Sequence, residues 1–175
     1  SALHELIALP SARITVLAHT RWASVGRISE ANAHPVDSRW SDGDPDTPLV
    51  VAALNGDVDN YLSLFGSAHQ PDEGGITTDA KVIPVLLSKR LAAGGEPCAA
   101  LVACLDDFDG SMAITVQPQS TDGELVLGVK GSGQALYIGL SPSGFMVASE
   151  VYGLIGATGS FLRVDGGTFP GAGRP

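Results

Sequence analysis

Short apolar runs separated by polar turns divide the first third of the chain into candidate elements. Residues 2–9 have the apolar spacing of a helix, which stops at Pro10. Residues 13–18 alternate as a strand does, and residues 49–54 are a nearly all-apolar run that fits a buried strand. Residues 58–65 fit a short helix or turn. This part of the chain is therefore predicted to mix helices and strands.

Turn-forming residues mark the breaks between these runs. Residues 37–48 and 67–76 are rich in Pro, Gly and polar residues and are predicted to be loops. Asn55-Gly56 follows the apolar run directly and is predicted to turn the chain. Long connections with so few apolar residues are expected to lie at the surface.

Two helices are predicted in the middle of the chain. Residues 79–93 carry a wide apolar face, and residues 77–79 offer side-chain oxygens as N-caps. Pro84 lies near the first turn, where its missing N–H is tolerated, and residues 94–95 are glycines that end the helix. Residues 97–107 are predicted to form the second helix.

The C-terminal half is predicted to be mainly β-structure. The expected strands are 111–117, 124–130, 135–140, 145–148 and 160–164. Residues 131–133 (GSG) are predicted to be a hairpin turn, and residues 150–156 a short helix. The Gly- and Pro-rich residues 166–175 resemble a linker, which leaves 1–165 as one domain. Strands, then helices, then strands indicate an α+β fold with stacked sheets.

Composition narrows the class of function. The chain has 175 residues, of which 44% are hydrophobic and 17% charged, as expected for one globular domain. Its net charge is −9, and the sequence has no basic stripe, so no nucleic-acid partner is expected. No apolar run approaches about 18 residues and no secretory leader is visible, so we expect a cytoplasmic protein without membrane association. Cys98 and Cys104 are interpreted as buried thiols of a reducing compartment.

Three separated motifs carry the chemistry of a possible site: residues 19–24 (HTRWAS), the Asn55-Gly56 pair, and Asp79. Arg21 can hold a carboxylate with two parallel N–H bonds, and Asp79 can accept an ammonium group. The Asn55 side chain and the Gly56 N–H can stabilise an oxyanion. If the three motifs converge, they form a pocket for free glutamine.

Each motif alone has an ordinary structural explanation. Arg21 could form a structural salt bridge, and Trp22 could belong to the core. Asn55-Gly56 could be a hairpin turn, and Asp79 a helix cap. His19 and His34 show no metal spacing and are expected to be satisfied structural histidines. The acidic residues at 106, 107 and 109 are interpreted as a solvated turn, so neither a metal nor a cofactor is expected.

The motifs together resemble a known family. The similar segments are 19–24, 29–35 (SEANAHP), 55–56, 78–79, 108–111 (FDGS), 128–133 (GVKGSG) and 147–150 (VASE). They resemble the glutaminase domain of isomerizing glutamine–fructose-6-phosphate aminotransferases, also called glucosamine-6-phosphate synthases. That domain belongs to the class II glutamine amidotransferases. The resemblance implies an N-terminal nucleophile fold, a four-layer αββα sandwich.

The resemblance also implies roles for individual residues. Arg21 would bind the α-carboxylate of glutamine and Asp79 its α-ammonium, while Asn55 and Gly56 would form the oxyanion hole. Trp22 would cap the site, and the Ser24 hydroxyl, where the family usually has Thr, would bond the substrate. A thiolate would attack the amide. The released ammonia would pass to a sugar-phosphate isomerase domain, C-terminal in the parent chain, for amino-sugar phosphate synthesis.

The chain departs from the family pattern at its opening, at two histidine positions, and in a longer loop between His34 and Asn55. No Cys-Gly-Ile opening is present, and about 50 residues would have to precede Ser1, given usual domain sizes. Val25 and Leu54 replace usual histidines. Ser1 is not favoured as the nucleophile, because the helix that follows it lies well after the nucleophile strand in the family.

Given these departures, we expect the parent protein to be an enzyme and this chain by itself to be inactive. Without its first strand the sheet would have unpaired edges, so we expect low stability, dimer formation, or retention of a cleaved peptide. One alternative is a non-catalytic glutamine-binding or docking module of the same fold. The other is a plain α+β domain whose motifs arise by chance.

Overall fold

The computed structural model describes residues 14–39, 48–66, 75–121, 123–142 and 144–166. The predicted helix at 2–9, Ser1, most of both predicted loops and nearly all of the predicted linker lie outside these residues. Where the domain ends therefore stays a prediction.

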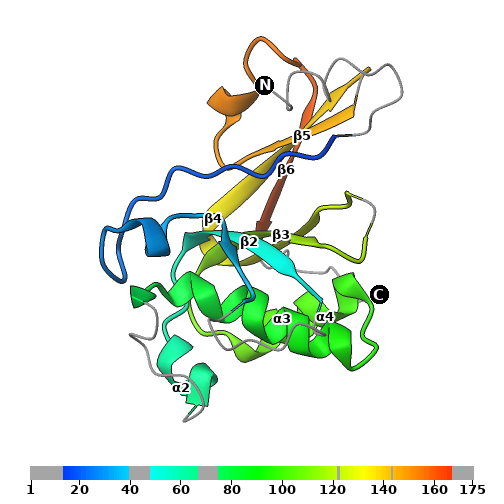
Figure 1. The fold of residues 1–175 in the computed structure, drawn as a ribbon. Helices are drawn as coiled ribbons and strands as arrows, with labels where there is room; N and C mark the ends of the chain where they lie inside the picture. The colour runs from blue at the N-terminus through cyan, green and yellow to red at the C-terminus, as the bar shows by residue number, and fades with distance from the viewer. Residues whose placement is uncertain (1–13, 40–47, 67–74, 122, 143, 167–175) are drawn as a thin grey trace, which may run out of the picture.

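The described residues form an α+β fold built on one antiparallel sheet (Figure 1). The strands are β1 (Val36–Asp37), β2 (Val50–Gly56), β3 (Met112–Pro118), β4 (Val126–Ser141), β5 (Gly144–Ala148) and β6 (Phe161–Gly166). The α-helices are α2 (Tyr61–Phe65), α3 (Val82–Ala92) and α4 (Pro97–Asp107). The described residues also include the 3-10 helices η1 (Glu30–Asn32), η4 (Asp79–Lys81) and η5 (Val151–Leu154). The predicted α+β class is confirmed.

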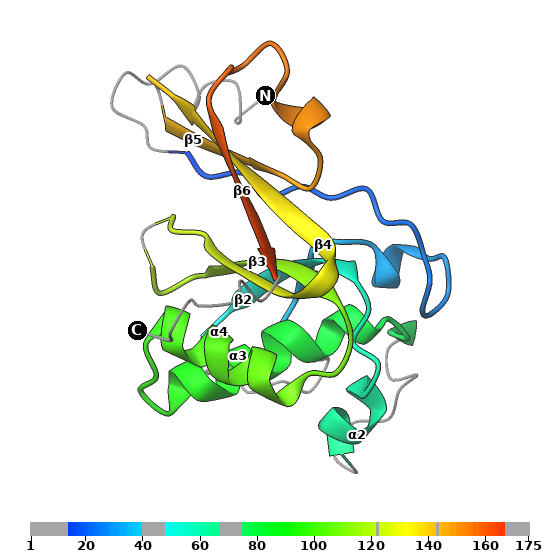
Figure 2. The same cartoon turned by 180° about the vertical axis from the view of Figure 1, so that it is seen from behind.

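Strand β4 connects the two parts of the sheet. The strand order is β1-β2-β3-β4-β5, and β6 also pairs with β4. The first residues of β4 pair with β3, from Val126 opposite Val116 to Lys130 opposite Met112. Its later residues pair with β5 and β6. Figure 2 shows this long strand running from the helices to the far end of the molecule.

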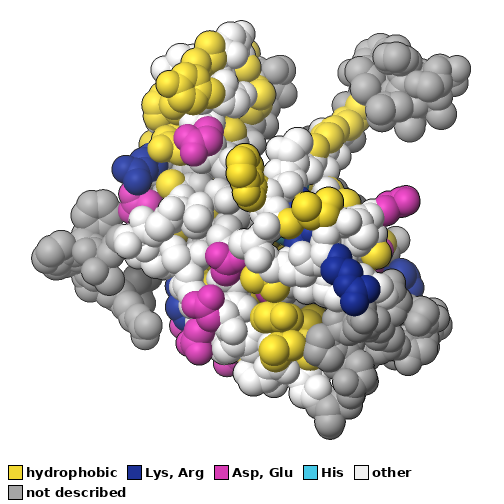
Figure 3. Space-filling view, turned by 90° about the vertical axis from the view of Figure 1, so that its left-hand side faces the viewer, with side chains coloured by type: hydrophobic (Ala, Val, Ile, Leu, Met, Phe, Trp, Pro, Cys, Tyr) yellow, Lys and Arg dark blue, Asp and Glu magenta, His cyan; other side chains and the backbone are white. Residues whose placement is uncertain are grey.

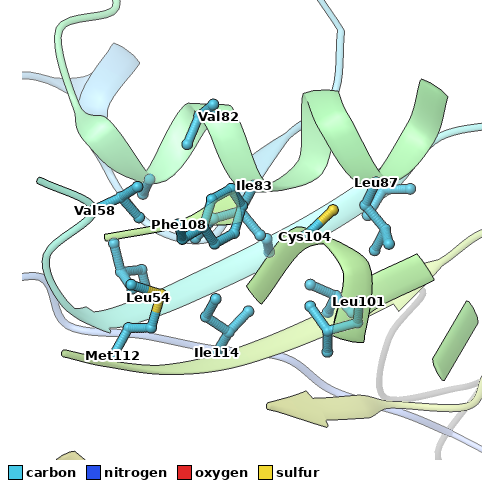
Figure 4. Close-up of a cluster of buried hydrophobic side chains, with 14 of the residues drawn as sticks. Leu54, Val58, Val82, Ile83, Leu87, Leu101, Cys104, Phe108, Met112 and Ile114 are labelled. Carbon is cyan, nitrogen blue, oxygen red and sulfur yellow. The ribbon is translucent and has the colours of Figure 1, made fainter. Parts of the chain in front are cut away.

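The core lies between the helices and the first part of the sheet. Figure 4 shows side chains of α3 and α4 meeting those of β2 and β3. The largest fully buried apolar side chains are Phe108, Ile83, Leu87, Leu101, Met112, Ile114, Leu154, Val50, Val58, Val82 and Val116. Helices α3 and α4 thus form one helical layer on the sheet, which accounts for part of the four-layer sandwich.

The two helices predicted in the middle of the chain are present as α3 and α4, although α3 begins differently from the prediction. Helix α4 has the predicted bounds, because the Glu96 carboxylate accepts the Ala99 N–H at 2.9 Å and Pro97 opens the first turn. Helix α3 follows the 3-10 turn at Asp79–Lys81, and the side chain of Thr78 makes no capping bond. The prediction that residues 77–79 supply N-cap oxygens is therefore wrong. No helix among the residues described has both the length and the apolarity to span a membrane.

Three strand and turn predictions are corrected. Residues 14–18 form no strand, and Val16 is 71% exposed, so their alternation does not mark a buried face. Asn55 and Gly56 do not turn the chain but complete β2, opposite Ala113 and Met112 of β3.

The predicted hairpin at 131–133 is also wrong, because β4 continues through it. Its register with β6 shifts between Gly131 and Ala135, and Gly131 has a φ of 75°. The Gly133 N–H donates to the Ser111 hydroxyl at 2.9 Å. The glycines therefore produce a bulge that bends the strand rather than a turn that reverses it.

The two cysteines differ in environment. Cys104 is fully buried in the core, whereas Cys98 is exposed in the first turn of α4. The expectation of two buried thiols is therefore wrong for Cys98. Arg90 Nε donates to Cys104 Sγ at 3.2 Å, and burial raises the pKa of that thiol. Cys104 is thus a packed, protonated side chain.

Candidate functional site

A cavity of about 370 Å³ collects all six residues predicted to form the site. Its wall includes Arg21, Trp22, Ser24, Asn55, Gly56 and Asp79. They come from three places: the loop after residue 18, the end of β2, and the start of η4. The structure therefore brings together the three separated motifs.

A buried amide joins two of these places. Asn32, which is fully buried in η1, donates from Nδ2 to Ser29 Oγ at 2.8 Å and to the Gly75 carbonyl at 3.1 Å. Its Oδ1 accepts the N–H groups of Thr77 and Thr78 at 2.7 and 2.9 Å. All four hydrogen-bonding positions of the amide are used. Asn32 thereby fixes the segment that leads into Asp79.

The Arg21 loop is held by its own guanidinium. Arg21 Nη1 donates to the Arg27 carbonyl at 3.0 Å, and Nη2 donates to the Val25 carbonyl. Gly26 lies so close to Thr77 that an added Cβ would be 2.5 Å from the Thr77 carbonyl oxygen. These bonds use two of the five guanidinium N–H donors. Among the residues described, Arg21 forms no salt bridge, so the ion-pair interpretation of this residue is not supported.

Gly56 ends β2 in a conformation that requires glycine. Its φ is 107°, and an added Cβ would be 2.1 Å from the Ser111 carbonyl oxygen. An L-residue is both strained and blocked at this position. The close approach of Gly56 to Ser111 sets the direction in which the chain leaves β2, and with it the position of Asp57.

Asp79 is buried beside the cavity and does not cap a helix with its side chain. Asp79 is 4% exposed, and its Oδ2 accepts the Val58 N–H at 2.8 Å. Burial raises the pKa of this carboxyl, and the charge of Asp57 raises it further, whereas the Val58 N–H lowers it. Oδ1 also accepts a weak bond from the Thr78 hydroxyl at 3.4 Å.

Two histidines in the wall were not predicted as site residues. His19 Nδ1 lies 2.9 Å from His34 Nδ1, so one of the two nitrogens carries the shared proton. His34 Nε2 is buried and has no hydrogen-bond partner in the described part of the chain, which contradicts the expected satisfied histidine. Burial, followed by the charges of His19 and Arg21, lowers the pKa of His34 from 6.5 to about 4, although the Leu54 backbone acts in the opposite direction. Burial also lowers the pKa of His19.

Trp22 and Asp57 also belong to the wall of the cavity. Trp22 is 96% exposed, so it is no core residue. Asp57, which sequence reasoning did not select, accepts a hydrogen bond from the Ser24 hydroxyl through Oδ1. Gln134 and Glu150 also line the cavity. Neither Cys98 nor Cys104 lies in its wall.

Comparison with known proteins finds similarity both in fold and in sequence. Solved glutamine phosphoribosylpyrophosphate amidotransferase from B. subtilis superposes with a TM-score of 0.62 at 23% identity, over 84% of this chain and 30% of that one. A solved allosteric regulatory enzyme of purine biosynthesis superposes with a TM-score of 0.57 at 23% identity, over 75% of this chain and 27% of that one. The chain has the N-terminal nucleophile amidotransferase fold.

Sequence relatives of this amidotransferase-fold chain are named glutamine–fructose-6-phosphate aminotransferase [isomerizing]. The relative from Xylella fastidiosa (strain Temecula1) is 32% identical over 157 residues, or 86% of the chain and 23% of the relative. The relative from Methanosarcina mazei is 34% identical over 161 residues, or 85% of the chain and 24% of the relative. That from Shewanella oneidensis is 33% identical over 164 residues, or 90% and 24%. The chain spans about a quarter of the length of these curated relatives, and no protein-family model matches it.

Proposed function

We propose that the chain is the glutamine-binding part of a glutamine-hydrolysing unit. In a longer parent enzyme that resembles isomerizing glutamine–fructose-6-phosphate aminotransferase, this unit would supply ammonia for amino-sugar phosphate synthesis. The observation that carries the proposal is the convergence of Arg21, Asp79 and the Asn55-Gly56 pair on one cavity. A free amino acid presents one carboxylate and one ammonium, which match the guanidinium and the carboxyl.

The chemistry of the wall supports a division of roles. Arg21 would bind the α-carboxylate with the N–H groups that its loop does not use, and Asp79 would accept the α-ammonium. The Asn55 side chain and the Gly56 N–H would receive the negative oxygen of the tetrahedral intermediate. Removal of one such donor typically raises the barrier by about 2.7–4 kcal/mol. Exposed Trp22 would fold over bound glutamine and exclude water.

The attacking thiolate would come from the parent protein. Cys104 is buried in the core and Cys98 is exposed on α4, so the described cavity wall holds no thiol. We propose that a cysteine upstream in the parent chain completes the site, and that this chain alone hydrolyses no glutamine. The partners would be glutamine and a C-terminal sugar-phosphate isomerase domain, in a cytoplasmic protein.

A second candidate is a non-catalytic glutamine-binding or docking module with the same fold. It is favoured by the lack of a thiol in the described wall and by apolar Val25 and Leu54 in that wall. The sequence encoded upstream of Ser1 distinguishes the two. A Cys-Gly-Ile opening together with glutaminase activity of the native protein supports the enzyme, and an inactive native protein that still binds glutamine supports the module.

Calorimetric titration of the chain with L-glutamine tests the proposal itself. Arg21→Lys keeps the charge but loses the forked geometry, so we expect binding to weaken by about tenfold or more. Arg163→Lys, on β6 and ion-paired with Asp165, is the matched control and should bind as the wild type does. Failure of the wild-type chain to bind glutamine, or equal binding by the Arg21 variant, would overturn the proposed site.

A further inference from the structure

Hydrogen bonds connect the Arg21 guanidinium with the segment that carries Asp79. Arg21 Nη1 donates to the Arg27 carbonyl at 3.0 Å, and the Arg27 N–H donates in turn to Thr77 Oγ1 at 2.8 Å, across 50 positions of sequence. Thr77 lies two residues before Asp79 in the chain. The backbone of Arg27 and the hydroxyl of Thr77 therefore link two side chains that face the same cavity.

The main chain of Thr77 is fixed independently of its hydroxyl. Its N–H donates to Asn32 Oδ1 at 2.7 Å, and the N–H of Thr78 donates to the same oxygen at 2.9 Å. Thr78 is buried and leads directly into η4. Because Asn32 is fully buried and uses every hydrogen-bonding position, Thr77 presents its hydroxyl to the Arg21 loop from a fixed place.

Close packing holds the same contact from the other side. Gly26 precedes Arg27 and has a φ of 83°. A Cβ added to Gly26 would be 2.5 Å from the Thr77 carbonyl oxygen and 2.8 Å from Thr77 Oγ1. This packing prevents the two backbones from approaching further, and the hydrogen bond from the Arg27 N–H opposes their separation.

We propose that Thr77 is a positioning residue, which sets the separation between the Arg21 guanidinium and the Asp79 carboxyl. This assignment rests on the proposed function, in which these two groups bind the α-carboxylate and the α-ammonium of one amino acid. Both ligand groups are attached to the same carbon atom, so their separation is fixed. A site that already holds its own groups at the matching separation spends less free energy on ordering when the ligand binds. Thr77 does not belong to the described cavity wall, so it acts through the Arg21 loop.

Calorimetric titration of three variants with L-glutamine tests this assignment. Thr77→Val keeps the branched shape of the side chain but leaves the Arg27 N–H without its acceptor, so we expect glutamine to bind about threefold to tenfold more weakly. Thr77→Ser keeps the hydroxyl and should bind within about twofold of the wild type. Thr158→Val is the matched control, because the Thr158 hydroxyl also accepts a backbone N–H, from Ser160 at 3.1 Å, outside the described cavity wall. This control should bind as the wild type does.

A ligand with one charged group distinguishes positioning from a general loosening of the fold. Glutaramate is glutamine without its α-amino group, so it can bind Arg21 but has no ammonium for Asp79. Its binding does not depend on the separation of the two, and Thr77→Val should therefore bind it as well as the wild type does in ligand-observed NMR. A wild type that binds no glutamine overturns the proposed function. Glutamine binding that Thr77→Val leaves unchanged, or weakens no more than glutaramate binding, overturns this inference alone.

Gly26→Ala provides an independent measurement, which also decides the matter if Thr77→Val does not fold by circular dichroism. The added methyl group forces the Arg21 loop away from Thr77 at the same contact. We expect glutamine binding to weaken by about tenfold or more, and by a larger factor than glutaramate binding. Equal glutamine affinity in this variant and the wild type would contradict the positioning role of Thr77.

Discussion

At the scale of single residues, two polar side chains of the same segment behave in opposite ways. The amide of Asn32 uses every hydrogen-bonding position, whereas His34 leaves a buried ring nitrogen without a partner among the residues described. A buried polar atom without a partner costs free energy unless a bound group supplies one. Asn32 therefore serves to hold the wall, and His34 is the residue whose environment a ligand can change.

His34 makes stability depend on pH. Its pKa falls from 6.5 to about 4 on folding, so between these values the unfolded chain binds a proton that the folded chain does not. Stability from this group is present above pH 6.5 and is lost as pH falls toward 4. We expect a lower melting temperature at pH 5 than at pH 7, and a smaller difference in His34→Gln.

Comparing the wild type with His34→Gln isolates the contribution of His34 to the pH dependence of stability. Asp79 has a raised pKa, so it acts in the opposite direction, and it does so equally in both proteins. The lowered pKa of His19 changes stability in the same direction as that of His34. Equal dependence of the melting temperature on pH in wild type and variant would show that His34 titrates normally.

The six residues proposed for the site could be selected because each lies in a recognisable motif, and all six line the cavity, although no pattern shows that they converge. His19, His34 and Asp57 also line the cavity but were not selected, for a physical reason. The approach of His19 to His34 depends on how η1 packs, and the bond from Ser24 to Asp57 depends on how the loop meets the end of β2. Neither is encoded in local spacing.

At the scale of elements, burial along α4 differs sharply between adjacent residues. Leu101 is 2% exposed and packs against Gly128 of β4, where an added Cβ would be 3.1 Å from one of its methyl carbons. Val102 is 58% exposed. The helix is therefore attached to the sheet along one face, and that face determines its contribution to stability.

Truncation at these adjacent positions measures that contribution. Leu101→Ala removes buried methyl groups and leaves a cavity, so the free energy of unfolding should fall by about 2–5 kcal/mol. Val102→Ala, on the solvent side of the same helix, should change it by no more than about 0.5 kcal/mol. Urea unfolding followed by circular dichroism compares the two. Similar losses at both positions would mean that α4 packs differently from the structure.

Elements were predicted well where local chemistry decides them. Capping by Glu96 and Pro97 fixed the start of α4, and the glycine after α3 has a φ of 87°, which fits its end. The glycines at 131 and 133 misled because a bulge and a hairpin use the same residue types. Here β4 continues through these glycines and pairs with β6, a long-range contact that the local spacing does not reveal.

At the scale of the whole molecule, the part of the sheet away from the helices leaves apolar side chains in solvent. Phe145 is 79% exposed, Leu162 60%, Phe161 45%, Leu140 43%, Met146 38% and Val164 37%. Figure 3 shows hydrophobic side chains gathered at this end. In the described residues β5 and β6 each pair with β4 alone, so their outer edges also present free backbone groups.

We expect the chain to self-associate through this end, which analytical ultracentrifugation at rising concentration can measure. Phe145→Ser combined with Leu162→Ser should shift the distribution toward monomer, because both remove exposed apolar area. Val102→Ser, which removes an exposed side chain from α4, should leave association unchanged. A wild-type chain that stays monomeric throughout and melts at high temperature would contradict the prediction.

The sixteen-residue strand β4 has one further consequence. Since it pairs with β3 at one end and with β5 and β6 at the other, the described part of the sheet cannot be divided into two self-sufficient pieces at the middle of this strand. A polypeptide stopped at Gly131 would lose the strand on which β5 and β6 assemble, and one started there would lose the helices. Any attempt to supply the amidotransferase fold as complementing fragments must therefore keep Val126–Ser141 intact.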